Sequence, residues 1–326
     1  MIICRAPYRL SLFGGGSDFP GWFREHDGAV LSTTINKYCY LTVRYLPPYF
    51  EHKHRVVWSH IENVATVDEI QHPIVRECLK YLEINEGLEI HHDGDIPARS
   101  GLGTSSSFAV GLLQALHTLK GDKVENKLDL ALEAIHIERD LCKDAGGWQD
   151  QIASSVGGLN FIKFGKDKPE IQSLGISSDR AKELESCLMM VFTGFPHTSS
   201  AIASTYNFSK EYELTEMTRQ AYEALDILKS GKITQIGELL HEAWQFKKSL
   251  SPQISSPYLD WVYQSARDAG AIGGKISGSG GGGFMTLFAE PDAQPKIKEK
   301  LGSLLQVPVK FEEQGVQVIF NNGGDA

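Results

Sequence analysis

The chain has 326 residues, of which 41% are hydrophobic and 22% are charged, the composition of a folded protein with one large or two medium domains. Asp and Glu outnumber Lys and Arg by 41 to 32, and the resulting net charge of −9 argues against a nucleic-acid-binding surface. The apolar runs fall far short of the roughly 20 residues that a membrane-spanning helix needs, and the first residues do not resemble a signal peptide.

The first third of the chain is predicted to form mainly strands. Residues 29–45 are rich in Val, Thr, Ile and Tyr, which favour extended structure, and residues 73–82 have the apolar spacing of a helix. The other strands predicted here are 2–13, 56–58 and 88–92. Trp58 could stack on adenine, but a strand tryptophan is more often part of the core, so we assign it to no site.

A first glycine cluster, Gly14–Gly16, follows the first predicted strand and precedes Asp18. Asp18 either caps a helix at 19–22 or accepts hydrogen bonds from the hydroxyls of a polar substrate. Arg9 lies inside the strand itself, where its side chain either is exposed or reaches into a site.

A second cluster of glycines and hydroxyls, residues 96–107, leads into an apolar pattern of helical spacing. The helix is predicted to begin near Thr104 or Ser105. Free N–H groups at a helix N-terminus attract phosphate, Gly101 and Gly103 allow close approach to the backbone, and hydroxyls can hold magnesium. The alternative is an ordinary capped helix after a loop.

A long helix is predicted over 127–143, and Glu138 lies on its apolar stripe. The stripe, spaced by three or four residues, is Leu128, Ala131, Ile135, Glu138 and Cys142. Carboxylates are rarely buried without a partner or a metal. Glu138 is therefore either a metal ligand or a boundary residue paired with an Arg or Lys.

Asp150 follows the pair Gly146–Gly147, in a short predicted helix that ends before Gly157–Gly158. It is either a first-turn acid that interacts favourably with the helix dipole or a general base in a desolvated pocket. Sequence spacing leaves both interpretations open.

The second half of the chain also mixes strands and helices. Strands are predicted at 159–164, 187–192, 272–276, 284–288 and 316–320, and helices over most of 199–267 and over 292–305. The break at 165–178 places the boundary between two expected lobes, 1–170 and 171–326, which share a cleft.

A third glycine cluster, residues 273–283, contains a formal G-x-G-x-x-G match. A predicted strand follows it where a dinucleotide site needs a helix, so we reject that site. A loop that lets another segment or a ligand approach closely fits better than a flexible hairpin turn.

In this order, the three clusters resemble the GHMP family of small-molecule kinases (galacto-, homoserine, mevalonate and phosphomevalonate kinases). The resemblance rests on residues 6–18, 97–107 and 273–288, which span nearly the whole chain. It implies an α+β GHMP kinase fold with an N-terminal ribosomal-protein-S5-like lobe, a C-terminal ferredoxin-like lobe and an active site in the cleft between them. Residues 14–20 and 146–151 look most like those of bacterial D-glycero-D-manno-heptose 7-phosphate kinases, with L-fucokinase and galactokinase as the next relatives.

The resemblance also implies roles for individual residues. The residues that would bind the ATP phosphates are Gly101, Leu102, Gly103, Thr104, Ser105 and Ser106. Ser105 and Glu138 would hold Mg²⁺, and Asp150 would be catalytic, with Arg9 beside it favouring its ionised form. The residues that would bind the sugar are Arg9, Gly15, Gly16, Ser17, Asp18 and Gly147. The third glycine cluster would form the floor of the cleft and support the phosphate loop.

The implied reaction is ATP-dependent phosphorylation of the anomeric hydroxyl of the heptose 7-phosphate, giving a 1,7-bisphosphate for nucleotide-activated heptose synthesis. Galactokinases carry Glu-His-Thr-Asp where this chain has residues 15–18, which argues against galactose. A 7-phosphate needs a basic pocket, for which Lys37, Arg99 and Lys275 are the candidates.

Two alternatives stay open: a kinase of fucose, mannose or a related hexose, and a non-catalytic sugar-sensing homologue. A sensor should lack the magnesium ligands or the base, whereas Ser105, Glu138 and Asp150 are all present. The expected partner is a small-molecule sugar phosphate, with no nucleic acid and no membrane, and a homodimer is one option for the assembly. The five scattered cysteines show no metal-binding spacing, so we expect reduced thiols and a cytoplasmic protein.

Overall fold

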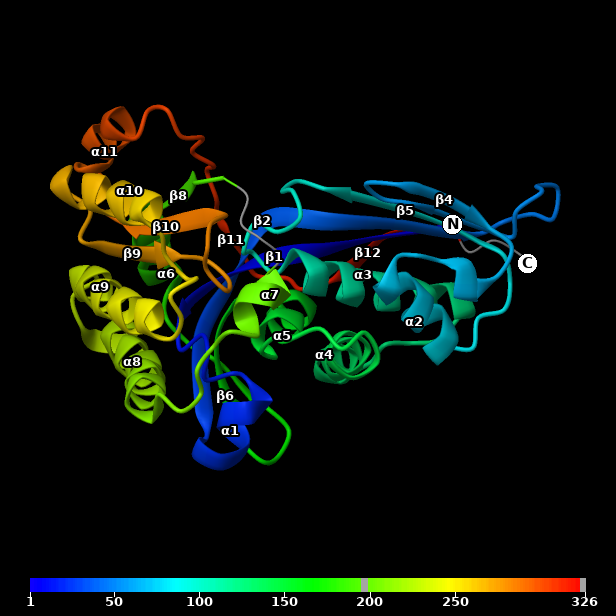
Figure 1. Cartoon of the computed structure of the whole chain (residues 1–326), viewed down its shortest axis with the longest axis horizontal. Helices are drawn as coiled ribbons and strands as arrows, with labels where there is room; N and C mark the ends of the chain where they lie inside the picture. The colour runs from blue at the N-terminus through cyan, green and yellow to red at the C-terminus, as the bar shows by residue number, and fades with distance from the viewer. Residues whose placement is uncertain (195–198, 323–326) are drawn as a thin grey trace.

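The computed structural model describes residues 1–194 and 199–322, which form two lobes joined side by side (Figure 1). One lobe is built on a nine-stranded sheet and the other on a three-stranded sheet. Each sheet is covered by helices, and the site described below lies where the lobes meet.

The long strand β2 (Gly28–Tyr45) organises the larger sheet, because several strands pair with different parts of it. It runs antiparallel to β1 (Ile2–Phe13), while its first part pairs with β6 (Leu159–Phe164) and its last part with β5 (Leu88–Gly94). The remaining strands of this sheet are β3 (His54–Val57), β4 (Ile61–Val64), β7 (Glu170–Ser173), β11 (Phe311–Glu312) and β12 (Gln317–Asn321).

The last described strands return to this first sheet. β12 pairs antiparallel with β1, with Ile2 opposite Asn321, and β11 pairs with β2. Strands from both sides of residue 170 thus contribute to one sheet, and the predicted division of the chain at that residue stays a prediction.

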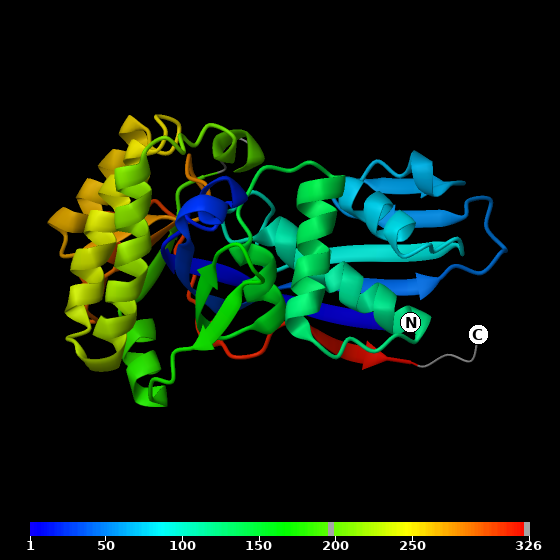
Figure 2. The same ribbon diagram turned by 90° about the horizontal axis from the view of Figure 1, so that it is seen from below.

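Helices cover one face of the larger sheet, with α3 (Thr104–Lys120) packed on β1 and β2 (Figure 2). Phe108, Leu112 and Leu116 are buried along this helix, which explains their spacing in the sequence. The other helices of this lobe are α1 (Pro20–His26), α2 (Pro73–Tyr81), α4 (Lys127–Ile135), α5 (Gln149–Val156) and the short 3₁₀ turn Val67–Glu69.

The second lobe contains an antiparallel sheet in the order β8–β10–β9. Its strands are β8 (Leu188–Phe192), β9 (Gly273–Ile276) and β10 (Phe284–Phe288). Its helices are α6 (Ser178–Ser186), α7 (Ser199–Ala203), α8 (Glu211–Ser230), α9 (Thr234–Ser249), α10 (Pro257–Asp268) and α11 (Gln294–Lys300). Helices α8 and α9 also contact β1, which joins the two lobes.

The helix predicted over 127–143 is the main departure from the sequence-based expectations. Helix α4 ends at Ile135 and continues as a π-helical turn, His136–Leu141, which contains Glu138. Such turns occur frequently at functional sites. The five cysteines are free. The helices of residues 1–194 and 199–322 are too short or too polar to cross a membrane.

Candidate active site

A cavity of about 870 Å³ lies between the two lobes. This volume is typical of sites for small molecules. Its walls come from β1, the loop before α3, the π-helical turn, the start of α5, α9 and β9. Most of the predicted site residues therefore meet in one place.

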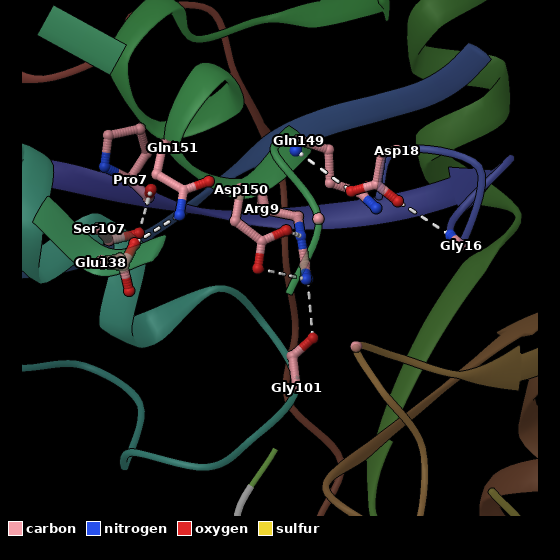
Figure 3. Close-up of polar contacts among 12 residues, drawn as sticks. Pro7, Arg9, Gly16, Asp18, Gly101, Ser107, Glu138, Gln149, Asp150 and Gln151 are labelled. Atoms are coloured by element: carbon pink, nitrogen blue, oxygen red, sulfur yellow. Dashed lines mark hydrogen bonds and ion pairs between the residues drawn. The ribbon is translucent and has the colours of Figure 1, made fainter. Parts of the chain in front are cut away.

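Arg9 of β1 and Asp150 of α5 line this cavity and form a bidentate ion pair (Figure 3). Arg9 Nε donates to Asp150 Oδ1 at 2.6 Å and Nη2 donates to Oδ2 at 2.8 Å, while Nη1 donates to the Gly101 carbonyl at 2.7 Å. The side chain of Arg9 is 5% exposed and that of Asp150 is 21% exposed. Asp150 is thus both a first-turn acid of α5 and a carboxylate open to the cavity.

The loop before α3, which we call the glycine loop (residues 100–103), is packed between Arg9 and the third glycine cluster. Gly103 has the left-handed backbone conformation, with φ of 73°, directly before the first residue of the helix. A methyl group at Gly101 would lie 2.5 Å from the Ser277 carbonyl oxygen, and one at Gly278 would lie 2.6 Å from the Gly101 Cα. The two glycine segments therefore touch through their backbones, which leaves the N-terminus of α3 facing the cavity.

Glu138 is buried, with 1% of its surface exposed, and its partners are neutral. Its Oε1 accepts from Ser105 Oγ at 2.7 Å and its Oε2 accepts from Gln151 Nε2 at 2.5 Å. Within residues 1–194 and 199–322 no Arg or Lys forms an ion pair with it, so the interpretation as a residue paired with a cation is wrong.

The surroundings of Glu138 fit a magnesium ion that is bound together with a nucleotide. Mg²⁺ commonly takes one or two carboxylates and completes its coordination with phosphate oxygens and water. Ser105 lies in the first turn of α3, where phosphate is favoured by the free N–H groups. In the described part of the chain, no cluster of three or more His, Cys, Asp or Glu side chains could hold a metal unaided. A metal here would need further ligands, such as phosphate oxygens and water.

Asp18 lies on the other side of the Arg9–Asp150 pair from Glu138 (Figure 3). It accepts from the backbone N–H groups of Gly16 at 2.9 Å and Gln149 at 3.2 Å. Burial raises the pKa of this carboxyl, and the negative charge of Asp150 raises it further. Phe19, not Asp18, is the residue before α1, and it has no side-chain cap, so the helix-cap interpretation of Asp18 is wrong.

Two buried lysines from the second lobe border the same region. Lys247 of α9 donates from Nζ to the carbonyls of Ile276 at 2.9 Å and Gly278 at 2.5 Å. Burial lowers its pKa to about 7, with a further contribution from Arg9. Burial also lowers the pKa of Lys275, on β9, well below its ordinary value. The second lobe thus places two buried lysine side chains within electrostatic range of Arg9 and Asp18 of the first.

Aromatic side chains also line the cavity. His72 stacks on Phe108 with ring centroids 4.6 Å apart, and Trp58 meets His72 edge-on at 4.9 Å. Burial lowers the pKa of His72 to about 4, so its ring is neutral at pH 7. Trp58, which we expected in the core, is only half-buried and lines the cavity.

Three of the residues singled out in the sequence lie elsewhere. Leu102 is buried in the core, and the Ser17 hydroxyl donates to backbone carbonyls in a turn, so neither side chain lines the cavity. Lys37 also lies outside it, whereas Arg99 and Lys275 line it. The remaining predicted site residues that line it are Arg9, Gly15, Gly16, Asp18, Gly101, Gly103, Thr104, Ser105, Ser106, Glu138, Gly147 and Asp150.

Comparison with known proteins assigns this fold and site to a class. Residues 73–158 match the GHMP kinases N-terminal domain and residues 221–306 match the GHMP kinases C-terminal domain, together more than half of the chain. The chain belongs to the GHMP kinases, and it is a phosphotransferase that uses ATP. The predicted family and its α+β fold are confirmed.

Within the GHMP kinases, the chain is similar to several sugar kinases. D-glycero-alpha-D-manno-heptose 7-phosphate kinase from Campylobacter jejuni is 29% identical over 311 residues, which are 89% of this chain and 90% of that protein. The bifunctional fucokinase/GDP-fucose pyrophosphorylase of Arabidopsis thaliana is 26% identical over 93% of this chain and 31% of its own length. A crystal structure of a D-glycero-D-manno-heptose 1-phosphate kinase from Bacteroides thetaiotaomicron superposes with a TM-score of 0.81 and 23% identity, covering 98% of this chain and 100% of that one.

Proposed function

We propose that this kinase transfers the γ-phosphoryl group of ATP to the anomeric hydroxyl of D-glycero-D-manno-heptose 7-phosphate. The observation that carries the proposal is the similarity to the Campylobacter kinase over nearly the full length of both chains. The buried Asp18 beside the catalytic pair supports it, because a carboxyl group there can accept hydrogen bonds from sugar hydroxyls.

Asp150 is the candidate catalytic base. In the reaction, the anomeric oxygen forms a bond to the γ-phosphorus, the bond from that phosphorus to the β-bridging oxygen breaks, and the hydroxyl proton passes to Asp150. Arg9 holds both oxygens of Asp150 with two hydrogen bonds, so the carboxylate is fixed in orientation before the acceptor arrives.

The glycine loop and the N-terminus of α3 are the candidate site for the phosphates. Their free N–H groups and the helix dipole favour the negative charge that spreads over the transferring group. Ser105 and Glu138 would hold Mg²⁺, which neutralises charge on the β- and γ-phosphates when it is bound. The cavity-lining rings of Trp58, His72 and Phe108 are the candidate contacts for adenine.

The test is release of ADP from Mg-ATP with a panel of acceptors. The panel contains D-glycero-D-manno-heptose 7-phosphate, the corresponding 1-phosphate, the phosphate-free heptose, mannose, L-fucose, galactose and mevalonate. Turnover confined to the 7-phosphate supports the proposal. A higher kcat/KM for the 1-phosphate or for a neutral sugar would show that the protein is a kinase with a different acceptor. Sugar binding without any turnover would favour a sensor.

A further inference from the structure

We propose that Arg139, assisted by Arg24, binds the terminal phosphate of the sugar phosphate substrate at the outer end of the cavity. This inference rests on the proposed function and adds to it the subsite that recognises the phosphate. Neither arginine was among the basic residues suggested by the sequence.

Arg139 is held at the cavity wall by the backbone. It follows Glu138 in the π-helical turn, and its Nη2 donates to the Gly147 carbonyl at 3.1 Å, with Nη1 at 3.5 Å from the Asp144 carbonyl. A methyl group at Gly146 would lie 2.7 Å from both Cζ and Nη2 of this guanidinium. A glycine at position 146 therefore leaves room for the arginine.

The charge of Arg139 is not matched by the protein. Its Nε is buried and has no hydrogen-bond partner, and in residues 1–194 and 199–322 no carboxylate forms an ion pair with it. Arg139 as a whole is half-buried, but a buried N–H group without a partner is costly to leave unsatisfied. An anionic ligand in the cavity would supply that partner, and a planar guanidinium can bind phosphate with two parallel hydrogen bonds.

A second, smaller cavity of about 340 Å³ adjoins the main one at this point and adds Arg24 of α1. The two cavities share the lining residues Phe19, Arg139, Asp144, Ala145, Gly146 and Ala203. Two carboxylates also border the smaller cavity: Asp140 is paired with His136 at 2.8 Å, and Asp144 opposes an anion. Two arginines thus face two aspartates here, and Asp140 is hydrogen-bonded to His136 while neither arginine forms an ion pair within the described residues.

The contacts of Arg139, Asp18 and Asp150 follow one another along residues 146–150, as the phosphate, the ring hydroxyls and the anomeric hydroxyl follow one another in the substrate. Arg139 contacts Gly146 and Gly147, Asp18 contacts Gly147 and Gln149, and Asp150 follows directly. In the heptose 7-phosphate, the phosphate is attached through the exocyclic carbons, several bonds from the anomeric hydroxyl. With that hydroxyl at Asp150, the ring hydroxyls would face Asp18 and the phosphate would face Arg139.

The buried lysines are less suitable for this role. Lys247 already donates to two carbonyls, and both Lys247 and Lys275 interact electrostatically with Arg9 and Asp18. They therefore lie near the centre of phosphoryl transfer, whereas Arg139 lies where the main cavity joins the smaller one.

The experiment compares Arg139→Met, Arg139→Lys and Arg24→Met with the wild type on two acceptors, the heptose 7-phosphate and the phosphate-free heptose. For Arg139→Met we expect KM for the 7-phosphate to rise roughly tenfold to a hundredfold, with kcat/KM for the phosphate-free sugar changed by less than about twofold. Arg139→Lys should recover part of the loss, and Arg24→Met should give a smaller rise. Lys37→Met, outside the cavity, controls for the loss of one positive charge.

An equal loss on both acceptors in Arg139→Met, or an unchanged KM for the 7-phosphate, would overturn the subsite while leaving the proposed function intact. The proposed function itself fails if the wild type does not prefer the 7-phosphate, and the subsite then fails with it. If Arg139→Met does not fold, as judged by its thermal transition, the same two-acceptor comparison on Arg139→Lys and Arg24→Met decides.

Discussion

The backbone of Gly147 lies directly against the carboxylate of Asp18, and a methyl group added at Gly147 would lie 1.8 Å from Asp18 Oδ2. The two residues come from different elements, the turn after β1 and the turn before α5. The position of Asp18 is thus set by the absence of a side chain at residue 147. The neighbouring Gly146 makes room for Arg139 in the same way.

Replacing Gly147 with Ala should therefore displace Asp18. We expect KM for the sugar to rise about tenfold or more, because small displacements of positioning groups have large kinetic effects. Affinity for ATP should change little. Gly21→Ala is the matched control, since a methyl group there would meet Phe208 Cδ2 at 3.9 Å, an ordinary contact. An unchanged sugar KM in Gly147→Ala would show that Asp18 does not contact the acceptor.

Asp150→Asn tests the catalytic base. An amide cannot take the hydroxyl proton, so kcat should fall roughly a hundredfold to ten-thousandfold. ATP binding, measured by calorimetry, should be retained. The midpoint temperature of thermal unfolding should also fall, because the Arg9 side chain is 5% exposed and would lose its counter-charge. Near-normal turnover would remove Asp150 from the role of base.

Glu138→Gln separates a metal-binding role from a structural one. We expect the Mg²⁺ concentration for half-maximal rate to rise at least roughly tenfold, because a carboxylate ligand is replaced by a neutral amide. The midpoint temperature of thermal unfolding should stay the same or rise, since a buried carboxylate with neutral partners is replaced by a neutral amide. Glu133→Gln, on helix α4 and paired with His117, should leave the Mg²⁺ dependence unchanged. A large loss of stability with normal Mg²⁺ dependence in Glu138→Gln would contradict the assignment.

Lys247 makes stability depend on pH in a predictable direction. Its pKa is about 7 in the folded protein against an ordinary value of 10.5, so the unfolded chain binds more protons between these pH values. The free energy of unfolding must then rise with pH across this window, by up to about 1.4 kcal/mol per pH unit from this group. Lys247→Met should flatten the rise, as measured by urea unfolding at pH 7 and pH 9. Lys248→Met is the control, because Lys248 is a partly exposed lysine that pairs with Asp260. If the free energy of unfolding rises equally with pH in Lys247→Met and in the wild type, Lys247 is not the group responsible.

Local structure could be predicted well because it depends on neighbouring residues. The strand 2–13, the strands 159–164 and 284–288 and the start of the helix at Thr104 all follow from apolar spacing and glycine positions. The π-helical turn was missed because the spacing argument assumes an α-helix. Its hydrogen-bond register depends on tertiary contacts such as those of Glu138 with Ser105 and Gln151.

Of two cavity residues that the sequence analysis did not single out, Lys247 has a recognisable sequence pattern and Arg139 does not. Lys247 lies on the buried face of α9, three residues after Trp244 and four after Ala243, the same pattern that singled out Glu138. Arg139 could not be found in this way, because its placement depends on Gly146. The loop between the π-helical turn and α5 brings this glycine against the guanidinium of Arg139. Contacts of this kind depend on loop geometry, which apolar periodicity does not report.

The pairing of β12 with β1 has a consequence for the order in which the protein is made. A ribosome makes Ile2–Arg5 well before their partners, Gln317–Asn321. Until then the nascent chain carries an open strand edge, of the kind that pairs readily with other chains. Arg9 lies on the same strand, and its neighbour Lys275 is also made late. The sheet of the first lobe is therefore begun well before it can be completed, and the candidate active site cannot form before β9 has been translated.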